Sequence, residues 1–189
     1  MSENTSKPSI GIIIGTNRPN RIGYGIAEWL QNAMHNDRLN LSLIDLAEID
    51  LPFLDEPDIP AHGNYQKEHT QAWSQIINEY AGFVLLFPQY NWGYPAVLKN
   101  ALDYLYEEWA GKPVSILCYG GHGGFQGALA MSLVIQGLRM HSMATNIPLD
   151  IEDEMFDEHG QFKDIDAALE PYKISAQLVS TEFVSLLEK

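Results

Sequence analysis

The sequence has little cysteine, few basic residues and no long apolar run. Its 189 residues include one cysteine, Cys118, which excludes an intramolecular disulfide framework and favours a reducing, cytoplasmic setting. Lys and Arg number 11 against 25 Asp and Glu, and the net charge of -14 opposes binding to nucleic acid, whose phosphates need clustered cations. No segment approaches the roughly 18 consecutive apolar residues that span a bilayer, and no signal peptide is evident. We therefore expect a cytoplasmic protein with neither nucleic acid nor a membrane as its partner.

Motifs of metal and nucleophilic chemistry are also missing. The six histidines are scattered, and no H-E-x-x-H or paired-cysteine spacing occurs, so we expect no metal site. Residues 120–124 read Gly-Gly-His-Gly-Gly, as in some esterase oxyanion loops, but the G-x-S-x-G nucleophile motif is absent. Cys118 lies in an apolar run and is expected to be an inert core thiol. No catalytic acid, base or nucleophile is assigned.

The composition is that of one globular domain. Hydrophobic residues make up 46% of the chain and charged residues 19%, which allows a sizeable core at this length. We expect residues 1–7 to form a short disordered leader and residues 8–189 to form a single domain. Two acidic segments, 45–58 and 150–166, hold six and eight of the Asp and Glu residues and are interpreted as solvated loops.

Short apolar runs alternate with amphipathic segments of helical length, which is typical of repeated βαβ units. Strands are predicted at residues 10–14, 39–46, 83–87 and 114–118, with a weaker fifth within 142–151. Helices are predicted at 22–33, 65–80, 96–106, 125–140 and 165–186, the last with Pro171 at its start or at a kink. This order predicts an α/β fold, a doubly wound five-stranded parallel sheet with helices on both faces. Such sheets bind ligands beyond the carboxyl ends of their strands.

The loop after the first predicted strand has the features of a phosphate site. It runs from Gly15 to Gly23 into the first predicted helix, whose N-terminal N–H groups and dipole favour an anion. Four of its side chains can bond phosphate oxygens, namely those of Thr16, Arg18, Asn20 and Arg21. The loop lacks G-x-G-x-x-G, which disfavours a dinucleotide site even though Asp45 could be a ribose-binding acid. A mononucleotide phosphate fits; the alternative is an ordinary capped helix start with two solvated arginines.

Two further loops at the same edge of the sheet could hold a flat heterocycle. Segment 88–95 has prolines at both ends and contains three aromatic residues, of which Trp92 and Tyr94 could equally lie at a subunit contact. Segment 119–124 contains four glycines, which let the backbone approach a ligand without obstruction by side chains. Its His122 is either a proton donor or a solvent-facing loop residue.

With these three loops the chain resembles the NADPH-dependent FMN reductase family, in the branch that includes quinone and azo-dye reductases. The resemblance covers residues 10–144. The family pattern G-S-x-R-x-x-R-x-G appears from Gly15 to Gly23, with threonine in place of serine. The pattern P-x-Y-N-x-x-x-P-x-x-L-K-N-x-x-D is intact from Pro88 to Asp103. Within it, glutamine replaces a frequent glutamate at position 89 and glycine a common serine at position 93.

The resemblance implies a flavodoxin-like fold that binds FMN. Thr16, Arg18 and Arg21 would contact the FMN phosphate. Residues 89–93 would surround the isoalloxazine ring, and residues 119–124 would lie beside its pyrimidine edge. The expected cofactor-binding residues are Gly15, Thr16, Arg18, Asn20, Arg21, Gly23, Pro88, Gln89, Tyr90, Asn91, Trp92, Gly93, Tyr119, Gly120, Gly121, His122 and Gly123.

The resemblance also implies the activity of an FMN-dependent NAD(P)H oxidoreductase. Two electrons would pass from NADPH or NADH through FMN to a small-molecule acceptor, such as a quinone, an azo compound, free flavin or a metal complex, by a ping-pong mechanism. The alternatives are a flavodoxin-type electron carrier and an FMN-binding redox sensor, although flavodoxin phosphate loops usually lack arginine. A homodimer or homotetramer is expected, because a monomer would expose part of an aromatic cluster around the third predicted helix, which consists of Trp92, Tyr94, Tyr104, Tyr106 and Trp109.

Overall fold

A computed structural model describes residues 7–188 of the chain. The leader expected at residues 1–7 therefore lies outside the described residues, except for Lys7. The strands are β1 (Ser9–Ile14), β2 (Asn40–Asp45), β3 (Gly82–Pro88), β4 (Pro113–Gly120), β5 (His141–Ser142) and β6 (Ile147–Asp150). All strand pairs are parallel, in the order β2-β1-β3-β4-β5, and β6 also pairs with β4. The predicted parallel α/β sheet is confirmed.

The predicted fifth strand is divided into two short strands along β4. β5 pairs with the start of β4 and β6 with its end. Between them, the Ser115 hydroxyl donates to the carbonyl of Thr145 at 2.8 Å, and the Ile116 N–H donates to the side chain of Asn146 at 2.7 Å. Side chains thus replace two ladder hydrogen bonds, which explains why the strand pattern in this stretch of the sequence is weak.

The helices follow the predicted order with shifted ends. They are α1 (Gly23–Ala33), α2 (Leu46–Ile49), α3 (Glu68–Asn78), α4 (Ala96–Asp103), α5 (Phe125–Gly137), α6 (Ile165–Leu169) and α7 (Lys173–Leu187). The short α2 is not predicted; Asp45 caps it by accepting from the Ala47 N–H at 3.0 Å. The predicted helix at 165–186 is interrupted by a 3₁₀ turn at Glu170–Tyr172. Pro171 explains this break, because its ring cannot continue a regular α-helix.

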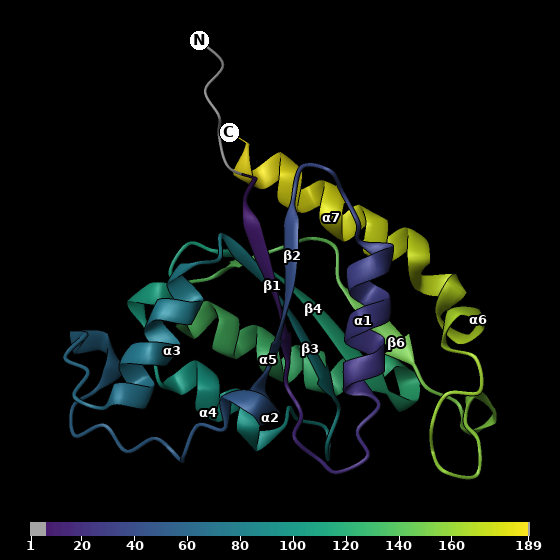
Figure 1. Cartoon of the computed structure of the whole chain (residues 1–189), viewed down its shortest axis with the longest axis horizontal. Coiled ribbons are helices and arrows are strands. Elements are labelled where there is room, and N and C mark those ends of the chain that lie inside the picture. Colours follow the sequence, from purple (N-terminus) through teal and green to yellow (C-terminus); the bar gives the residue numbers. More distant parts are fainter. Residues whose placement is uncertain (1–6, 189) are drawn as a thin grey trace.

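Two apolar layers hold the helices on the sheet. Figure 1 shows α1 and α7 on one side, and Ile26 and Phe183 from these helices pack with Ile12 of β1 in one core. Helices α3, α4 and α5 cover the other side, where Trp73 and Met131 belong to the second core. Alternate side chains of β1 and β3 enter opposite cores, as expected for central strands buried on both faces. Within residues 7–188, no helix has the length and apolar character needed to cross a bilayer.

Candidate cofactor site

The loops that follow β1, β3 and β4 meet at the carboxyl edge of the sheet. The Gly15 N–H donates to the carbonyl of Leu86 at 2.7 Å, and the Gln89 N–H donates to the carbonyl of Tyr119 at 2.8 Å. The Thr16 hydroxyl lies 3.3 Å from the Tyr90 hydroxyl. The structure therefore brings together the three segments in which the cofactor-binding residues were predicted.

The start of α1 is open to an anion. Among residues 7–188, no side chain caps this helix, and its first turn contains no acidic residue. The first N–H groups of a helix lack intrahelical partners and lie at the positive end of the helix dipole. Thr16 is buried just before the helix, and residues 17–20 are exposed, with Asn20 at a positive φ of 58°. Of the alternative, a capped helix start with two solvated arginines, the exposed Arg18 is present but a side-chain cap from residues 7–188 is not.

Gly23 is required for the packing of this loop. A Cβ at position 23 would lie 2.8 Å from the Tyr119 hydroxyl and 2.9 Å from Cγ2 of Thr16. Both distances are shorter than a normal contact, so a side chain here would push α1 away from β4. Burial raises the pKa of the Tyr119 hydroxyl above its usual value, and this hydroxyl therefore stays protonated beside the loop.

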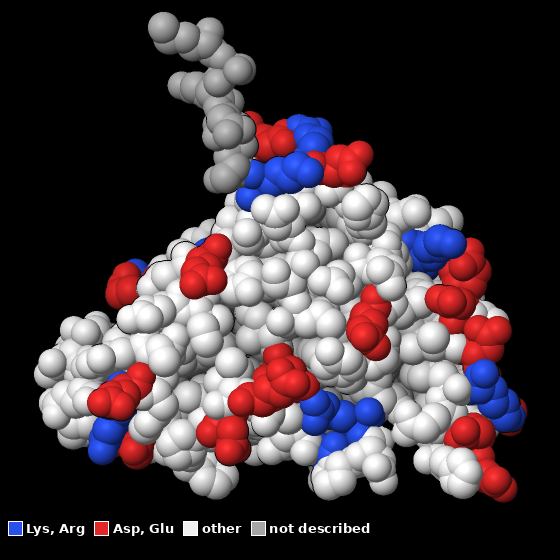
Figure 2. Space-filling model, in the orientation of Figure 1, with Lys and Arg blue, Asp and Glu red and all other residues white. Residues whose placement is uncertain are grey.

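Arg21 lies between the loop and the end of β2. Its guanidinium forms an ion pair with Asp45, which is only 7% exposed. The Nε of Arg21 is buried and has no hydrogen-bond partner among residues 7–188. Asp45 is therefore occupied by Arg21 and by the start of α2, and it is not one of the solvated acids expected in segment 45–58. In Figure 2 the basic patch at the lower rim lies directly beside acidic side chains.

The loop after β3 makes a tight and strained turn. Tyr90 and Gly93 exchange two backbone hydrogen bonds, of 2.9 and 2.8 Å. The two residues between them have positive φ values, 47° for Asn91 and 66° for Trp92. Asparagine tolerates this region, but a bulky residue such as tryptophan rarely occupies it. The Trp92 indole is 72% exposed, so the strain presents an aromatic side chain to solvent. Such strain is concentrated at functional sites in proteins.

The side chain of Gln89 ties this turn to α5. Its Oε1 accepts from the N–H of Gly127 at 2.8 Å, in the first turn of that helix. A Cβ on Gly127 would lie 3.2 Å from the carbonyl oxygen of Gly93, so the helix and the turn are in close contact. A glutamate at position 89 could accept the same bond. The departure from the family pattern at this position therefore leaves the local geometry intact.

The glycine-rich loop after β4 has an unusual backbone. His122, Gly123 and Gly124 have consecutive φ values of 58°, 64° and 62°, after Gly120 at 146°. The Gly123 N–H donates to Asp150 at 3.3 Å. Gly121 faces open space, since a Cβ there would have no atom within 4 Å. The loop thus offers bare backbone to a ligand, and the His122 side chain is exposed.

Cys118 lies beneath this loop. It is 1% exposed, and burial raises the pKa of its thiol to about 12. A thiol with such a pKa carries almost no thiolate at neutral pH, and the side chain of Cys118 lies in the core as expected. Within the described chain, no group of three or more His, Cys, Asp or Glu side chains is arranged to hold a metal ion.

Two members of the predicted aromatic cluster belong to the core. Tyr104 and Trp109 are fully buried, and Trp109 packs against Trp73 and Phe83 at ring distances of 6.3 and 5.2 Å. A 3₁₀ turn at Glu107–Trp109 folds this tryptophan under α3 and α4. A monomer was expected to expose part of this cluster, and that part includes Trp92, which is 72% exposed, but not Tyr104 or Trp109.

Comparisons with known proteins show the family of the chain and agree with its fold. Residues 8–152 match the NADPH-dependent FMN reductase family. The chain is 39% identical over 155 residues to the NAD(P)H-dependent FMN reductase LOT6 of Saccharomyces cerevisiae, covering 74% of this chain and 81% of that protein. It is 43% identical over 141 residues to the NAD(P)H-dependent FMN reductase C4B3.06c of Schizosaccharomyces pombe, covering 73% and 70%. Among solved structures, the flavoenzyme FerB of Paracoccus denitrificans superposes with a TM-score of 0.71 at 20% identity, covering 96% and 97% of the two chains.

Proposed function

The chain belongs to the NADPH-dependent FMN reductase family and is an NAD(P)H-dependent oxidoreductase that uses FMN, and from this premise we propose where the cofactor binds and how the protein works. The FMN phosphate binds at the start of α1, and the isoalloxazine ring lies across residues 89–93 and 119–123. The observation that carries this proposal is the buried, unpartnered Nε of Arg21 beside an uncapped helix start. An anion bound there would satisfy both.

The residues present at the edge of the sheet fit a phosphate ester. The exposed Arg18 and the half-buried Arg21 supply positive charge, and Thr16 supplies a hydroxyl. Charged hydrogen bonds from guanidinium groups to phosphate oxygens are among the strongest in proteins. Asp45 neutralises part of the charge of Arg21 and fixes its direction, so Arg18 is left as the main free cation of the proposed phosphate site.

The rest of the site provides orientation rather than proton transfer. When bound, FMN supplies the redox chemistry, because it can accept two electrons from a nicotinamide and donate them to an acceptor. The chain holds the ring edge with the backbone of residues 119–123, and the Gln89 bond to α5 keeps the neighbouring turn in place. No side chain is assigned as a catalytic acid or base.

The proposed domain is the whole of residues 8–189, since α7 packs into the same core as α1.

The visible spectrum of the purified protein is the most direct test of the proposed function. We expect a yellow protein whose colour bleaches when NADPH is added under nitrogen. A flavodoxin-type carrier or a redox sensor would hold FMN but would not oxidise NADPH promptly. A protein that is purified without FMN and still carries none after incubation with FMN and gel filtration would contradict the proposal.

We further propose that the nicotinamide and the acceptor use one binding position in turn. The oxidised nicotinamide must then leave before the acceptor enters. Initial rates measured over a grid of both substrates should therefore give parallel lines in double-reciprocal plots. Intersecting lines would show that both substrates bind together and would rule out this ping-pong mechanism.

Helix α5 offers the surface for a homodimer. Phe125, Leu129 and Leu133 recur at a spacing of four and are 63%, 58% and 71% exposed. They form one apolar stripe, which adjoins the Trp92 turn because Gly127 packs against Gly93. Exposed apolar patches on proteins usually mark contacts. We propose that a second copy of the chain covers this stripe.

The variant Leu133→Glu tests the dimer. Light scattering at micromolar concentration should give a dimer mass for the unmodified protein and a monomer mass for the variant, because a carboxylate would be buried in the contact. Ile174→Glu on α7 is the matched control, since Ile174 is also 71% exposed and lies outside the stripe. A monomer mass for the unmodified protein would overturn the proposal.

A further inference from the structure

A cavity of about 490 Å³ lies beside the proposed cofactor site, between the segment that follows α2 and the start of α4. Tyr90 and Asn17 of the cofactor loops form part of its wall, and Phe53 and Val97 form apolar parts. The volume is within the usual range for small-molecule sites, roughly 300–1,000 Å³. None of the nine lining residues carries a charged side chain. The cavity is therefore suited to an uncharged, largely apolar ligand.

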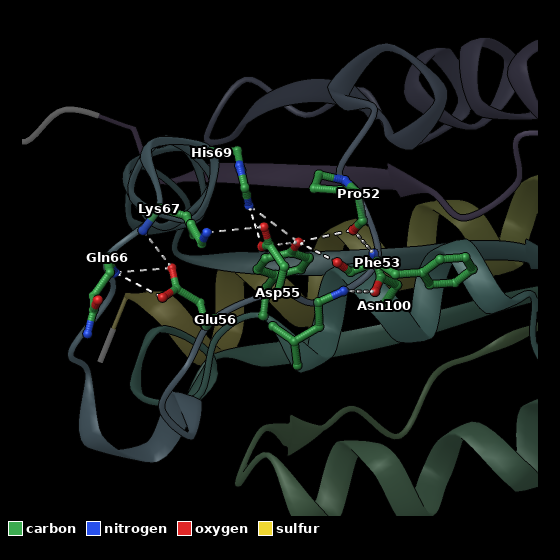
Figure 3. Close-up of polar contacts among 10 residues, drawn as sticks. Pro52, Phe53, Asp55, Glu56, Gln66, Lys67, His69 and Asn100 are labelled. Carbon is green, nitrogen blue, oxygen red and sulfur yellow. Dashed lines mark hydrogen bonds and ion pairs between the residues drawn. The ribbon is translucent and has the colours of Figure 1, made fainter.

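One wall of the cavity is a strap, residues 51–54, which has no regular secondary structure. Asn100 on α4 fixes this strap with both ends of its carboxamide. Its Nδ2 donates to the carbonyl of Pro52 at 2.7 Å, and its Oδ1 accepts from the N–H of Leu54 at 3.0 Å (Figure 3). The Tyr104 hydroxyl also donates to the Pro52 carbonyl, at 3.0 Å. The side chain of Asn100 thus pairs with the strap as a neighbouring peptide group would.

The chain beyond the strap is anchored to α3. Asp55 lies 2.8 Å from Nε2 of His69, and this hydrogen bond lowers the pKa of the Asp55 carboxyl below its usual value. Glu56 accepts from the N–H groups of Gln66 and Lys67, each at 2.9 Å (Figure 3). The backbone of the segment is therefore held at several points along its length.

The side chain of Phe53 is the exception in this anchored segment. It is 82% exposed although its backbone is fixed on both sides. An exposed aromatic ring on a fixed backbone can contact a ligand at little cost in conformational entropy. Because Phe53 contributes so little to the core, a role at the cavity accounts for its position better than a role in folding.

Acidic residues on either side of the strap favour a neutral ligand over an anionic one. Asp50 precedes it and Asp55 and Glu56 follow it in the chain. Asp55 is paired with Lys67 and His69, so Asp50 and Glu56 supply most of the negative charge that opposes the entry of phosphate-bearing molecules and disfavours the nucleotide part of NAD(P)H. A neutral aromatic ring meets no such barrier and can stack on Phe53 or Tyr90.

We propose that this cavity binds the non-reacting aromatic ring of a neutral two-ring acceptor, with Phe53 as its specificity-determining wall and Asn100 as the residue that positions this wall. The proposal rests on the proposed reductase function and adds the acceptor class to it. Asn100 lies within the signature from Pro88 to Asp103.

The kinetic test compares 2-phenyl-1,4-benzoquinone with 1,4-benzoquinone as acceptors. Phe53→Ala should raise KM for the phenyl-substituted quinone about five- to tenfold, with kcat unchanged, because one aromatic contact is lost. Asn100→Leu should raise KM for the phenyl-substituted quinone to a similar extent, because the strap that carries Phe53 loses its two hydrogen bonds to Asn100. Neither variant should change KM for 1,4-benzoquinone. Ile59→Ala is the control, since Ile59 is 58% exposed in the same connecting segment but does not line the cavity. Equal changes for both quinones would overturn the proposal.

A binding experiment without turnover separates this proposal from the proposed function. The oxidised, FMN-loaded protein is titrated with redox-inert 4-hydroxybiphenyl while backbone amide resonances are recorded. Shifts at Phe53, Leu54 and Val97 would support the cavity even if NADPH oxidation failed. Shifts confined to residues 89–93 and 119–123 would overturn it. Shifts at the strap caused by NADP⁺ but not by hydroxybiphenyl would assign the cavity to the nucleotide and would also overturn it.

Discussion

Replacing Gly124 with alanine should lower the free energy of unfolding by about 2–4 kcal/mol, through a strained backbone and an overpacked site. Gly124 has a φ of 62°, a region that alanine rarely adopts. A Cβ there would also lie 2.5 Å from Sγ of Cys118 and 3.2 Å from its backbone carbonyl carbon. Because β4 is central in the sheet, Cys118 has little room to move. Urea denaturation followed by circular dichroism measures the effect.

Gly121 provides the matched control in the same loop. A Cβ on Gly121 would have no atom within 4 Å, so Gly121→Ala should leave the stability nearly unchanged. The Cys118→Ala background adds a second check, since removing Sγ removes the shortest contact and should reduce the cost of Gly124→Ala. Equal midpoints for the two glycine variants would contradict the loop geometry described above.

Replacing Arg18 with alanine should weaken FMN binding by about 1.5–3 kcal/mol, the scale of a hydrogen bond to a charged group. This is roughly a ten- to 150-fold increase in Kd. Arg18 is exposed just before α1, and Arg21 already shares its charge with Asp45. The binding energy lost in Arg18→Ala should therefore come mainly from the contact with the FMN phosphate. Fluorescence titration of the FMN-free protein measures the affinity for FMN of the unmodified protein and of the variant.

Riboflavin separates a phosphate contact from a general effect on the site. It lacks the phosphate, so its affinity should be almost the same in Arg18→Ala and in the unmodified protein. Arg139→Ala is a suitable control variant, because Arg139 pairs with Glu107 away from the phosphate loop. Equal losses for FMN and riboflavin would mean that Arg18 does not bind the phosphate.

Much of the fold could be predicted because β1, β3 and β4 are buried on both faces. Ile12, Val84 and Leu117 lie in runs that are almost entirely apolar, and such runs between helical segments are typical of a parallel sheet. The fifth strand was harder to predict, since the side chain of Asn146 replaces a ladder bond in the middle of it. The ends of helices also differed, because caps and short 3₁₀ turns depend on neighbouring segments.

The candidate site was predictable to the extent that each of its three loops is a continuous segment of the sequence. The family signatures name the three segments, and the sheet topology brings them to one edge. The roles of Asp45 and Asn100 could not be predicted in the same way. Asp45 at the end of β2 contacts Arg21 in the loop after β1. Asn100 holds a strap about 46–48 residues earlier in the chain. The aromatic cluster that includes Tyr104 and Trp109 was expected to be exposed in part, and the structure shows that packing against Phe83 buries the tryptophan.

The sequence by itself determined the parallel α/β order, the family and the three loop segments in which we propose the cofactor site. These follow from patterns within single elements, such as the apolar run of β3 or the signature from Pro88 to Asp103. Only the tertiary structure decided that Arg21 shares its charge with Asp45, that α5 exposes an apolar stripe, and that Phe53 faces a cavity. The physical reason is that these properties depend on contacts between distant segments, or on their absence, and no local pattern of residues encodes them.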